Sequence, residues 1–305
     1  MSGTPGGGTG GGAQPTLVVS LNGSRGAADG SAVPMSPEDL VGAALAAVAA
    51  GAREVLVHPR TPCGRESLSP RVVGPLLEAL AEAGLGARSG GGVAVSVAVS
   101  VPSEPDHAAR LARIRSWTVL PDRAVVRFAE PGARELAEAL LERGVAVDAE
   151  VRAGGAVPAG GNVPADGAAA AGGNRLAGTE PAAGAAGGQA GSVARFLAWP
   201  LRDPARVRLV AELGSGRPGA VSELGSAGPG AVAELLRRLP PVPVVLFGRE
   251  EAAWPALRLA ARYGTGARIG VGDVLRLPDG RAARSNAELV AAAARAREVT
   301  TAGNR

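Results

Sequence analysis

The sequence of 305 residues contains no lysine, and this absence excludes two kinds of chemistry. An aldolase that forms a Schiff base and a Walker phosphate-binding loop both need a lysine amine. All 32 strongly basic residues are arginine, and 28 acidic residues reduce the formal net charge to +4. Arginine and acidic residues alternate along stretches such as 135–143, without a basic stripe or aromatic residues for stacking. We therefore expect no binding to nucleic acid.

Cysteine and long apolar segments are also scarce. The single cysteine, Cys63, cannot form an intramolecular disulfide, which is typical of a protein in the reducing cytoplasm. No segment is long and apolar enough to cross a membrane, and the glycine-rich start has neither the basic region nor the apolar run of a signal peptide. These features predict a cytoplasmic protein that does not bind membranes.

Glycine and proline are abundant, with 46 and 24 copies, but they are concentrated in a few segments. Residues 1–14 are expected to form a disordered tail, and residues 299–305 a second, short tail. Residues 153–192 contain glycine, alanine and proline but almost no large apolar residue, which predicts a long mobile insert without a stable helix. The remainder of residues 15–298 is expected to form one domain that this insert interrupts.

Within this domain, short apolar runs alternate with amphipathic stretches, a pattern typical of βα units around a parallel sheet. Strands are expected at residues 16–21, 54–58, 93–101, 123–128, 145–151, 193–199, 242–247 and 267–271. Helices are expected at residues 36–50, 70–83, 106–117, 132–143, 205–213, 231–239, 251–263 and 286–297. Eight such units favour an α/β fold of the (β/α)8 TIM-barrel type, with its chemistry at the C-terminal ends of the strands. An open doubly wound sheet is the alternative, although no G-x-G-x-x-G motif follows a strand and opens a helix.

The first candidate site residue ends the second expected strand. His58 lies in the stretch VLVHPRTPCGRESL, and because Arg60 follows two positions later, strand alternation directs both to the same side of the chain. Taken alone, a histidine at a strand end is commonly a structural residue that forms hydrogen bonds. Its surroundings decide between this interpretation and a role as a ligand.

Several stretches in order along the chain resemble the β-keto acid cleavage enzymes, in particular their high-GC actinobacterial members. They are the stretch around His58, LNGSR at 21–25, MSPEDLVGAALAAVAAGA at 35–52, RSWTVLPDRAVVRFAEPGA at 115–133 and ARIGVGDVLRLPDGRAARSNAELV at 267–290. The resemblance implies a TIM barrel and a homo-oligomer. It also implies a divalent metal, usually zinc, held by an H-x-H pair at the end of the second strand and by a glutamate near the eighth.

The resemblance implies a reaction as well. The metal would hold the keto and carboxylate oxygens of a β-keto acid, whose C–C bond is cleaved. Exchange of the acyl fragment with acetyl-CoA, the co-substrate, would give a new acyl-CoA and acetoacetate. Zinc suits this chemistry because it polarises the carbonyl group that must accept negative charge, and an arginine can hold the carboxylate.

The expected metal ligands are only partly present in this sequence. His58 matches the second histidine of the H-x-H pair, but Leu56 stands at the first position. In the family's R-x-G-x-E-D block, Arg268 and Asp273 match, whereas Gly272 stands where the metal-binding glutamate is expected. Because a catalytic zinc site normally uses three protein ligands, we expect the metal to be weakly bound or absent.

The remaining site residues are also carried over from the resemblance. The predicted catalytic residues are Arg268, Asp273 and Asp148, and Asp148 stands in place of a fifth-strand glutamate. Arg60 and Ser100 are predicted to bind substrate, and His58 is the predicted metal ligand. Arg127 stands in place of a fourth-strand asparagine. A purely structural role is the alternative for three of these residues. Arg268 and Asp273 could form a structural ion pair, and Arg60 could pair with Glu66.

Three functional hypotheses follow from these residues. The chain is an acetyl-CoA-dependent acyltransferase of the cleavage-enzyme type, or a pseudoenzyme that keeps the barrel to bind a carboxylate, an acyl-CoA or a partner subunit. A third option is a metal-free catalyst that uses Asp148 and Asp273 as a general acid/base pair. The site assignment requires His58, Asp148, Arg268 and Asp273 to converge at one mouth of the barrel.

Overall fold

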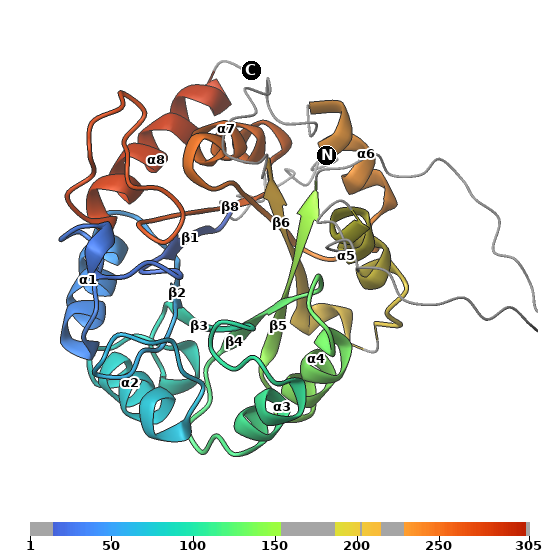
Figure 1. Ribbon diagram of the computed structural model, residues 1–305. Coiled ribbons are helices and arrows are strands. Elements are labelled where there is room, and N and C mark those ends of the chain that lie inside the picture. Colours follow the sequence, from blue (N-terminus) through green and yellow to red (C-terminus); the bar gives the residue numbers. More distant parts are fainter. Residues whose placement is uncertain (1–14, 154–186, 202, 215–228, 303–305) are drawn as a thin grey trace, which may run out of the picture.

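The computed structural model describes residues 15–153, 187–201, 203–214 and 229–302. Eight parallel strands pair in sequence order, and the last pairs with the first, so that the sheet closes into a barrel inside a ring of helices (Figure 1). The strands are β1 (Leu17–Ser20), β2 (Glu54–Val57), β3 (Ala94–Val99), β4 (Arg123–Arg127), β5 (Ala146–Ala153), β6 (Val207–Leu213), β7 (Val244–Phe247) and β8 (Gly266–Ile269). The predicted (β/α)8 TIM barrel is therefore confirmed, and the open sheet is excluded.

A helix follows each strand on the outside of the barrel (Figure 1). The helices are α1 (Pro37–Ala49), α2 (Pro70–Glu82), α3 (His107–Arg115), α4 (Ala133–Glu142), α5 (Gly187–Leu197), α6 (Pro229–Arg238), α7 (Ala253–Tyr263) and α8 (Asn286–Ala302), with short 3-10 turns η1 (Ala27–Asp29), η2 (Ala87–Ser89), η3 (Pro204–Arg206) and η4 (Glu250–Ala252) between them. Within the described residues, no helix has both the length and the hydrophobicity needed to cross a bilayer.

Local sequence fixes where several of these helices begin. At the start of α1, the Ser36 hydroxyl accepts a hydrogen bond from the backbone N–H of Asp39, and the Asp39 carboxylate accepts one from the backbone N–H of Ser36. Pro37 occupies the first helical position, where its missing N–H costs nothing. The Asp106 carboxylate caps α3 in the same way, by accepting from the N–H of Ala109.

Between β5 and β7, the segment predicted as a strand is a helix, and the segment predicted as a helix contains a strand. The expected strand at 193–199 falls largely in α5, and the expected helix at 205–213 contains β6. Val193 and Phe196 lie three residues apart, which places both on the buried face of a helix. In β6, by contrast, Arg208, Val210 and Glu212 alternate with outward apolar residues, as expected for a barrel strand.

The predicted insert at 153–192 is only partly described. Residue 153 ends β5, and residues 187–192 form the first part of α5, which the prediction of a segment without a stable helix missed. The residues in between, 154–186, lie outside the described part of the chain, as do the predicted tail at 1–14 and residues 303–305 of the predicted tail at 299–305. Residues 299–302, predicted to belong to the second tail, continue α8.

The apolar side chains form two separate regions. The larger region fills the space between the barrel and its helices. The smaller one is a layer across the inside of the barrel, and we call it the apolar layer; it consists of Val18, Leu56, Ala98, Val125, Val210, Val245 and Phe247. Each of these side chains points inward because it alternates with an outward residue on its strand. The barrel is thus a filled core, and the polar inward residues lie at its two ends.

The α5 assignment predicts a large loss of stability for Phe196→Ala. Phe196 is buried, and its ring packs edge-on against Phe128 with 5.6 Å between the ring centroids. Its removal should lower the free energy of unfolding by about 3–5 kcal/mol. Urea denaturation followed by circular dichroism measures this change. Val299→Ala, at a position 74% exposed on α8, serves as the control and should shift stability by less than about 0.5 kcal/mol. Equal losses in both variants would contradict this packing of α5.

Candidate active site at the C-terminal mouth of the barrel

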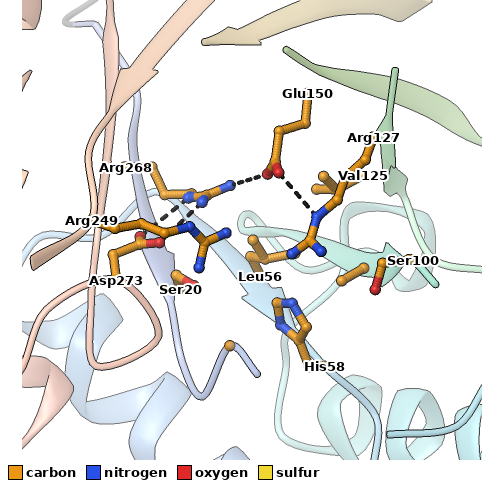
Figure 2. A pocket seen from close by; sticks show the side chains of 12 residues that line it. Ser20, Leu56, His58, Ser100, Val125, Arg127, Glu150, Arg249, Arg268 and Asp273 are labelled. Atoms are coloured by element: carbon orange, nitrogen blue, oxygen red, sulfur yellow. Dashed lines mark hydrogen bonds and ion pairs between the residues drawn. The ribbon is translucent and has the colours of Figure 1, made fainter. Parts of the chain in front are cut away.

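A pocket opens where the C-terminal ends of the strands meet (Figure 2). It contains about 280 Å³ of empty space, including the part open to solvent. Leu56 and Val125 of the apolar layer form part of its lining, and His58 and Arg127, two residues further along the same strands, lie around its opening. Alternation along the strands therefore puts an apolar floor below a polar rim. This is the end of a TIM barrel at which catalytic residues are found.

His58 lies in this pocket, as predicted for a site residue, and its side chain is only 5% exposed. Asn22 fixes the backbone there, because its side chain accepts from the N–H of His58 and donates to the carbonyl oxygen of the same residue. The imidazole Nδ1 is buried without a hydrogen-bond partner among the described residues. Burial, together with the positive charges of Arg127 and Arg268, lowers the pKa of His58 well below its usual value. The imidazole is therefore neutral.

Arg268 and Asp273 also meet at this pocket, and they form a two-point ion pair. The Arg268 Nε and Nη2 atoms donate to the two carboxylate oxygens of Asp273 at 3.1 and 3.0 Å, and Nη1 donates to Glu150 at 3.0 Å. The guanidinium also stacks on the ring of Phe247, 3.3 Å from its centroid. Burial alone would lower the pKa of Arg268, but the two carboxylates outweigh it and raise the pKa. Arg268 is thus oriented and neutralised by groups of the protein itself.

Glu150 is a site residue that the sequence reasoning missed. It lines the pocket from β5 and accepts hydrogen bonds from Arg268 and from Nε of Arg127 (Figure 2). Burial alone would raise the pKa of Glu150, but the charges of Arg127 and Arg268 outweigh it and lower the pKa to about 2. Its carboxylate is therefore ionised and holds two guanidiniums in fixed orientations.

Asp148, the predicted fifth-strand carboxylate, lies elsewhere. It points into the barrel two residues before Glu150, below the apolar layer, and does not line the pocket. There it accepts from Nε of Arg123 at 2.7 Å and from Nη2 of Arg208 at 2.7 Å. Asp148 and Glu150 both point into the barrel because they lie two residues apart on β5, but they reach different levels in it. A general acid/base pair of Asp148 and Asp273 is consequently not formed across one site.

The two predicted substrate-binding residues have different positions. Ser100 lines the pocket at the end of β3. Arg60 is not among the lining residues, because its guanidinium donates to the backbone carbonyl oxygens of Gly23, Arg25 and Gly64. Arg60 thereby ties the loop after β2 to the loop after β1. The Glu66 side chain accepts from Ser103.

Two further arginines complete the rim. Arg127 ends β4 and Arg249 follows β7, and Figure 2 shows both guanidiniums directed into the pocket around His58. Their side chains are 23% and 31% exposed, so that solvent and solutes reach them. Arg127 was noted in the sequence only as a substitution, and Arg249 was not noted. The signal for Arg249 is its position two residues after Phe247, on the inward side of the same run.

The residues of this site do not fit the divalent metal that the resemblance implies. Leu56, at one expected ligand position, belongs to the apolar layer. Gly272, at another, is packed so closely that an added Cβ atom would lie 2.4 Å from the Ser20 hydroxyl and 2.7 Å from the backbone nitrogen of Gly23. No glutamate side chain fits there unless the loop after β1 moves. In the described part of the chain, no three histidine, cysteine or acidic residues are grouped to hold a metal.

The fold and the pocket define a (β/α)8-barrel protein with a polar, arginine-rich mouth. The family model described as beta-keto acid cleavage enzyme matches residues 16–171 and 187–302. The chain therefore belongs to the β-keto acid cleavage enzyme family, as the resemblance of its sequence motifs indicated. No curated protein matches the sequence significantly.

Solved structures share the fold at low sequence identity. A ternary complex of ObcA with a C4-CoA adduct and oxalate is 14% identical, with a TM-score of 0.58, over 89% of this chain and 64% of that chain. A truncated 3-deoxy-D-arabino-heptulosonate 7-phosphate synthase from Thermotoga maritima is 12% identical, with a TM-score of 0.51, over 95% of this chain and 88% of that one. Dihydropteroate synthase from Yersinia pestis, in complex with a sulfonamide drug, is 14% identical, with a TM-score of 0.50, over 95% of each chain. At these identities they establish the barrel fold alone.

The position of Asp148 predicts that Asp148→Ala lowers stability without changing the pocket. The variant removes the carboxylate that pairs with Arg123 and leaves the buried Arg208 with Glu54 alone, which should cost about 3–5 kcal/mol in the free energy of unfolding. Because the apolar layer lies between Asp148 and the pocket, any affinity of the pocket for a small carboxylate such as acetoacetate should stay within about twofold of that of the unmodified protein. Chemical denaturation and calorimetric titration measure the two quantities. Glu78→Ala on the exposed face of α2 is the matched control. A stable variant that no longer binds would place Asp148 in the functional site.

The contact at Gly272 predicts a steric cost for a single methyl group. Gly272→Ala should lower the free energy of unfolding by about 1–3 kcal/mol, because the new Cβ overlaps Ser20 and Gly23. Gly42→Ala is the control, since an added Cβ at this exposed position in α1 meets nothing within 4 Å and alanine favours the helix. Thermal denaturation of both variants compares them. Equal stability of the two variants would show that the loops after β1 and β8 separate easily.

Proposed function

We propose that the barrel mouth binds a β-keto acid and that the protein exchanges its acyl group with acetyl-CoA. In this reaction R–CO–CH2–COO⁻ and acetyl-CoA give R–CO–S-CoA and acetoacetate, so that one C–C bond and one C–S bond break and one of each forms. Family membership supports the reaction class. The observation that carries the proposal is the pocket in which Arg127 and Arg249 lie around the neutral imidazole of His58. A cytoplasmic homo-oligomer belongs to the same proposal.

The side chains of the pocket supply two parts of this chemistry. Guanidiniums stabilise a substrate carboxylate and the negative charge that develops on a carbonyl oxygen when a C–C bond is cleaved, and they do so most strongly where water is excluded. A neutral imidazole with an unpartnered nitrogen can accept a proton, or release it again, next to the reacting carbon. Ser100 adds a hydroxyl group at the rim of the same pocket.

A second candidate is a binding protein without turnover, and one observation favours it. Two of the three metal ligands implied by the resemblance are replaced, by Leu56 in the apolar layer and by Gly272 in a backbone contact that has no room for a side chain. A barrel of this kind would keep the pocket as a site for a carboxylate or an acyl-CoA. It would lack the Lewis acid that zinc supplies in catalytic sites.

The test uses 3-oxopentanoate and acetyl-CoA with the purified full chain. The proposed exchange yields propionyl-CoA and acetoacetate, both of which mass spectrometry detects, and a panel of longer β-keto acids extends the assay. We expect product only when both substrates are present, and a loss of at least about 100-fold in kcat/KM for His58→Ala if the imidazole transfers the proton. Arg134→Ala, in an exposed ion pair on α4, is the control variant. A folded protein that binds the acid but forms no acyl-CoA from any member of the panel would establish the second candidate instead.

A further inference from the structure

We infer that two guanidiniums, Arg127 and Arg249, take the place of a divalent metal at the barrel mouth and form a metal-independent site for a carboxylate. The choice of a β-keto carboxylate as ligand rests on the proposed function, whereas the metal independence rests on the site itself. Neither the family match nor the similar structures assign this role to these two residues.

The first observation is how the two guanidiniums are held. Nε of Arg127 donates to Glu150 at 3.1 Å, and Nε of Arg249 donates to Glu212 at 3.1 Å. Each arginine thus uses one edge of its planar group for a buried carboxylate of the protein. The terminal nitrogens of both form no hydrogen bond with the described residues, and Nη1 of Arg127 lies 3.8 Å from a carboxylate oxygen of Glu130. Two oriented donor groups remain for a ligand in the pocket.

The second observation is the balance of charge. Two ion-pair networks that include the pocket's own charged side chains join five guanidiniums to four carboxylates. The members are Arg110, Arg127, Arg152, Arg249 and Arg268 with Glu130, Glu150, Glu212 and Asp273. One positive charge is left over. A carboxylate monoanion neutralises it, whereas a divalent cation would add two further charges to a cluster that is already positive.

The third observation is that the structure has filled the space a metal would need. Leu56 completes the apolar layer, and the contact between Gly23 and Gly272 closes the gap between the loops after β1 and β8. His58 retains a free imidazole nitrogen, but its charged neighbours in the pocket include three arginines. An arginine binds a carboxylate through two parallel N–H donors and keeps its charge at any pH the protein tolerates. The guanidinium pair therefore supplies the positive charge, although not the Lewis acidity, of a metal ion.

The test compares acetoacetate with its methyl ester, which has the same keto group but no charge. Isothermal titration is performed on protein that has been stripped with a chelator and dialysed, and again after addition of zinc chloride, with bound metal measured by mass spectrometry. We expect the Kd of acetoacetate to agree within about twofold in the two preparations. The methyl ester should bind at least about tenfold more weakly, because it forms no charged hydrogen bonds.

Variants assign the effect to the two arginines. Arg127→Gln and Arg249→Gln should each weaken acetoacetate binding by about 10- to 100-fold and leave the ester unaffected. Arg134→Gln on the exposed face of α4 removes an equal charge away from the pocket and should change nothing. If Arg127→Gln fails to fold by circular dichroism, Arg127→Lys keeps the charge but loses the planar pair of donors, and should bind acetoacetate more weakly than the unmodified protein.

The outcomes separate this inference from the proposed function. Binding that disappears on stripping and returns with stoichiometric zinc would overturn the inference, even if the cleavage reaction then proceeds. Unchanged affinity in both glutamine variants would overturn it as well. Metal-free binding that depends on both arginines, in a protein that forms no acyl-CoA, would support the inference and refute the proposed reaction.

Discussion

The apolar layer inside the barrel is the constraint on which the rest of the structure depends. A closed sheet delivers every second side chain of each strand to the interior, and that interior must be filled. Seven apolar side chains fill its middle level, so that the charged inward residues are confined to the two ends. Buried charges need partners close by, and each end has its own set. Asp148 and Glu150 are two residues apart on one strand, yet one belongs to an ion-pair cluster toward the N-terminal end of the barrel and the other to the candidate site.

This layering explains how much of the architecture was predictable from the sequence. Alternation of apolar runs with amphipathic stretches predicted the barrel, because each strand is buried on both sides and each helix on one. The prediction was wrong between β5 and β7. The short run that contains Phe196 and Trp199 has the amino-acid composition of a strand. Only the spacing of three residues between its buried apolar side chains indicates that it is a helix. The adjacent β6 carries charges at inward positions, which made a true strand resemble an amphipathic helix.

The candidate site was predictable at the positions where the family motifs are strongest. His58, Arg268, Asp273 and Ser100 were expected in the site, and all four line the pocket. Glu150 and Arg249 were not found, because their roles depend on the level they reach in the barrel, and a sequence alone does not specify strand register to two residues. The replacement of two ligand positions was visible in the sequence. The close contact between the loops after β1 and β8 at Gly272 was not visible, because it joins residues about 250 positions apart in the chain.

The contact between Gly23 and Gly272 also has a consequence for the engineering of this barrel. A glutamate introduced at position 272 alone would overlap Ser20 and Gly23, so that it would damage the fold before it could serve as a ligand. A metal centre at this position therefore requires the loop after β1 to move first. A designer who wishes to build a zinc site in this chain should begin with the loop that carries Gly23, and only afterwards change the ligands.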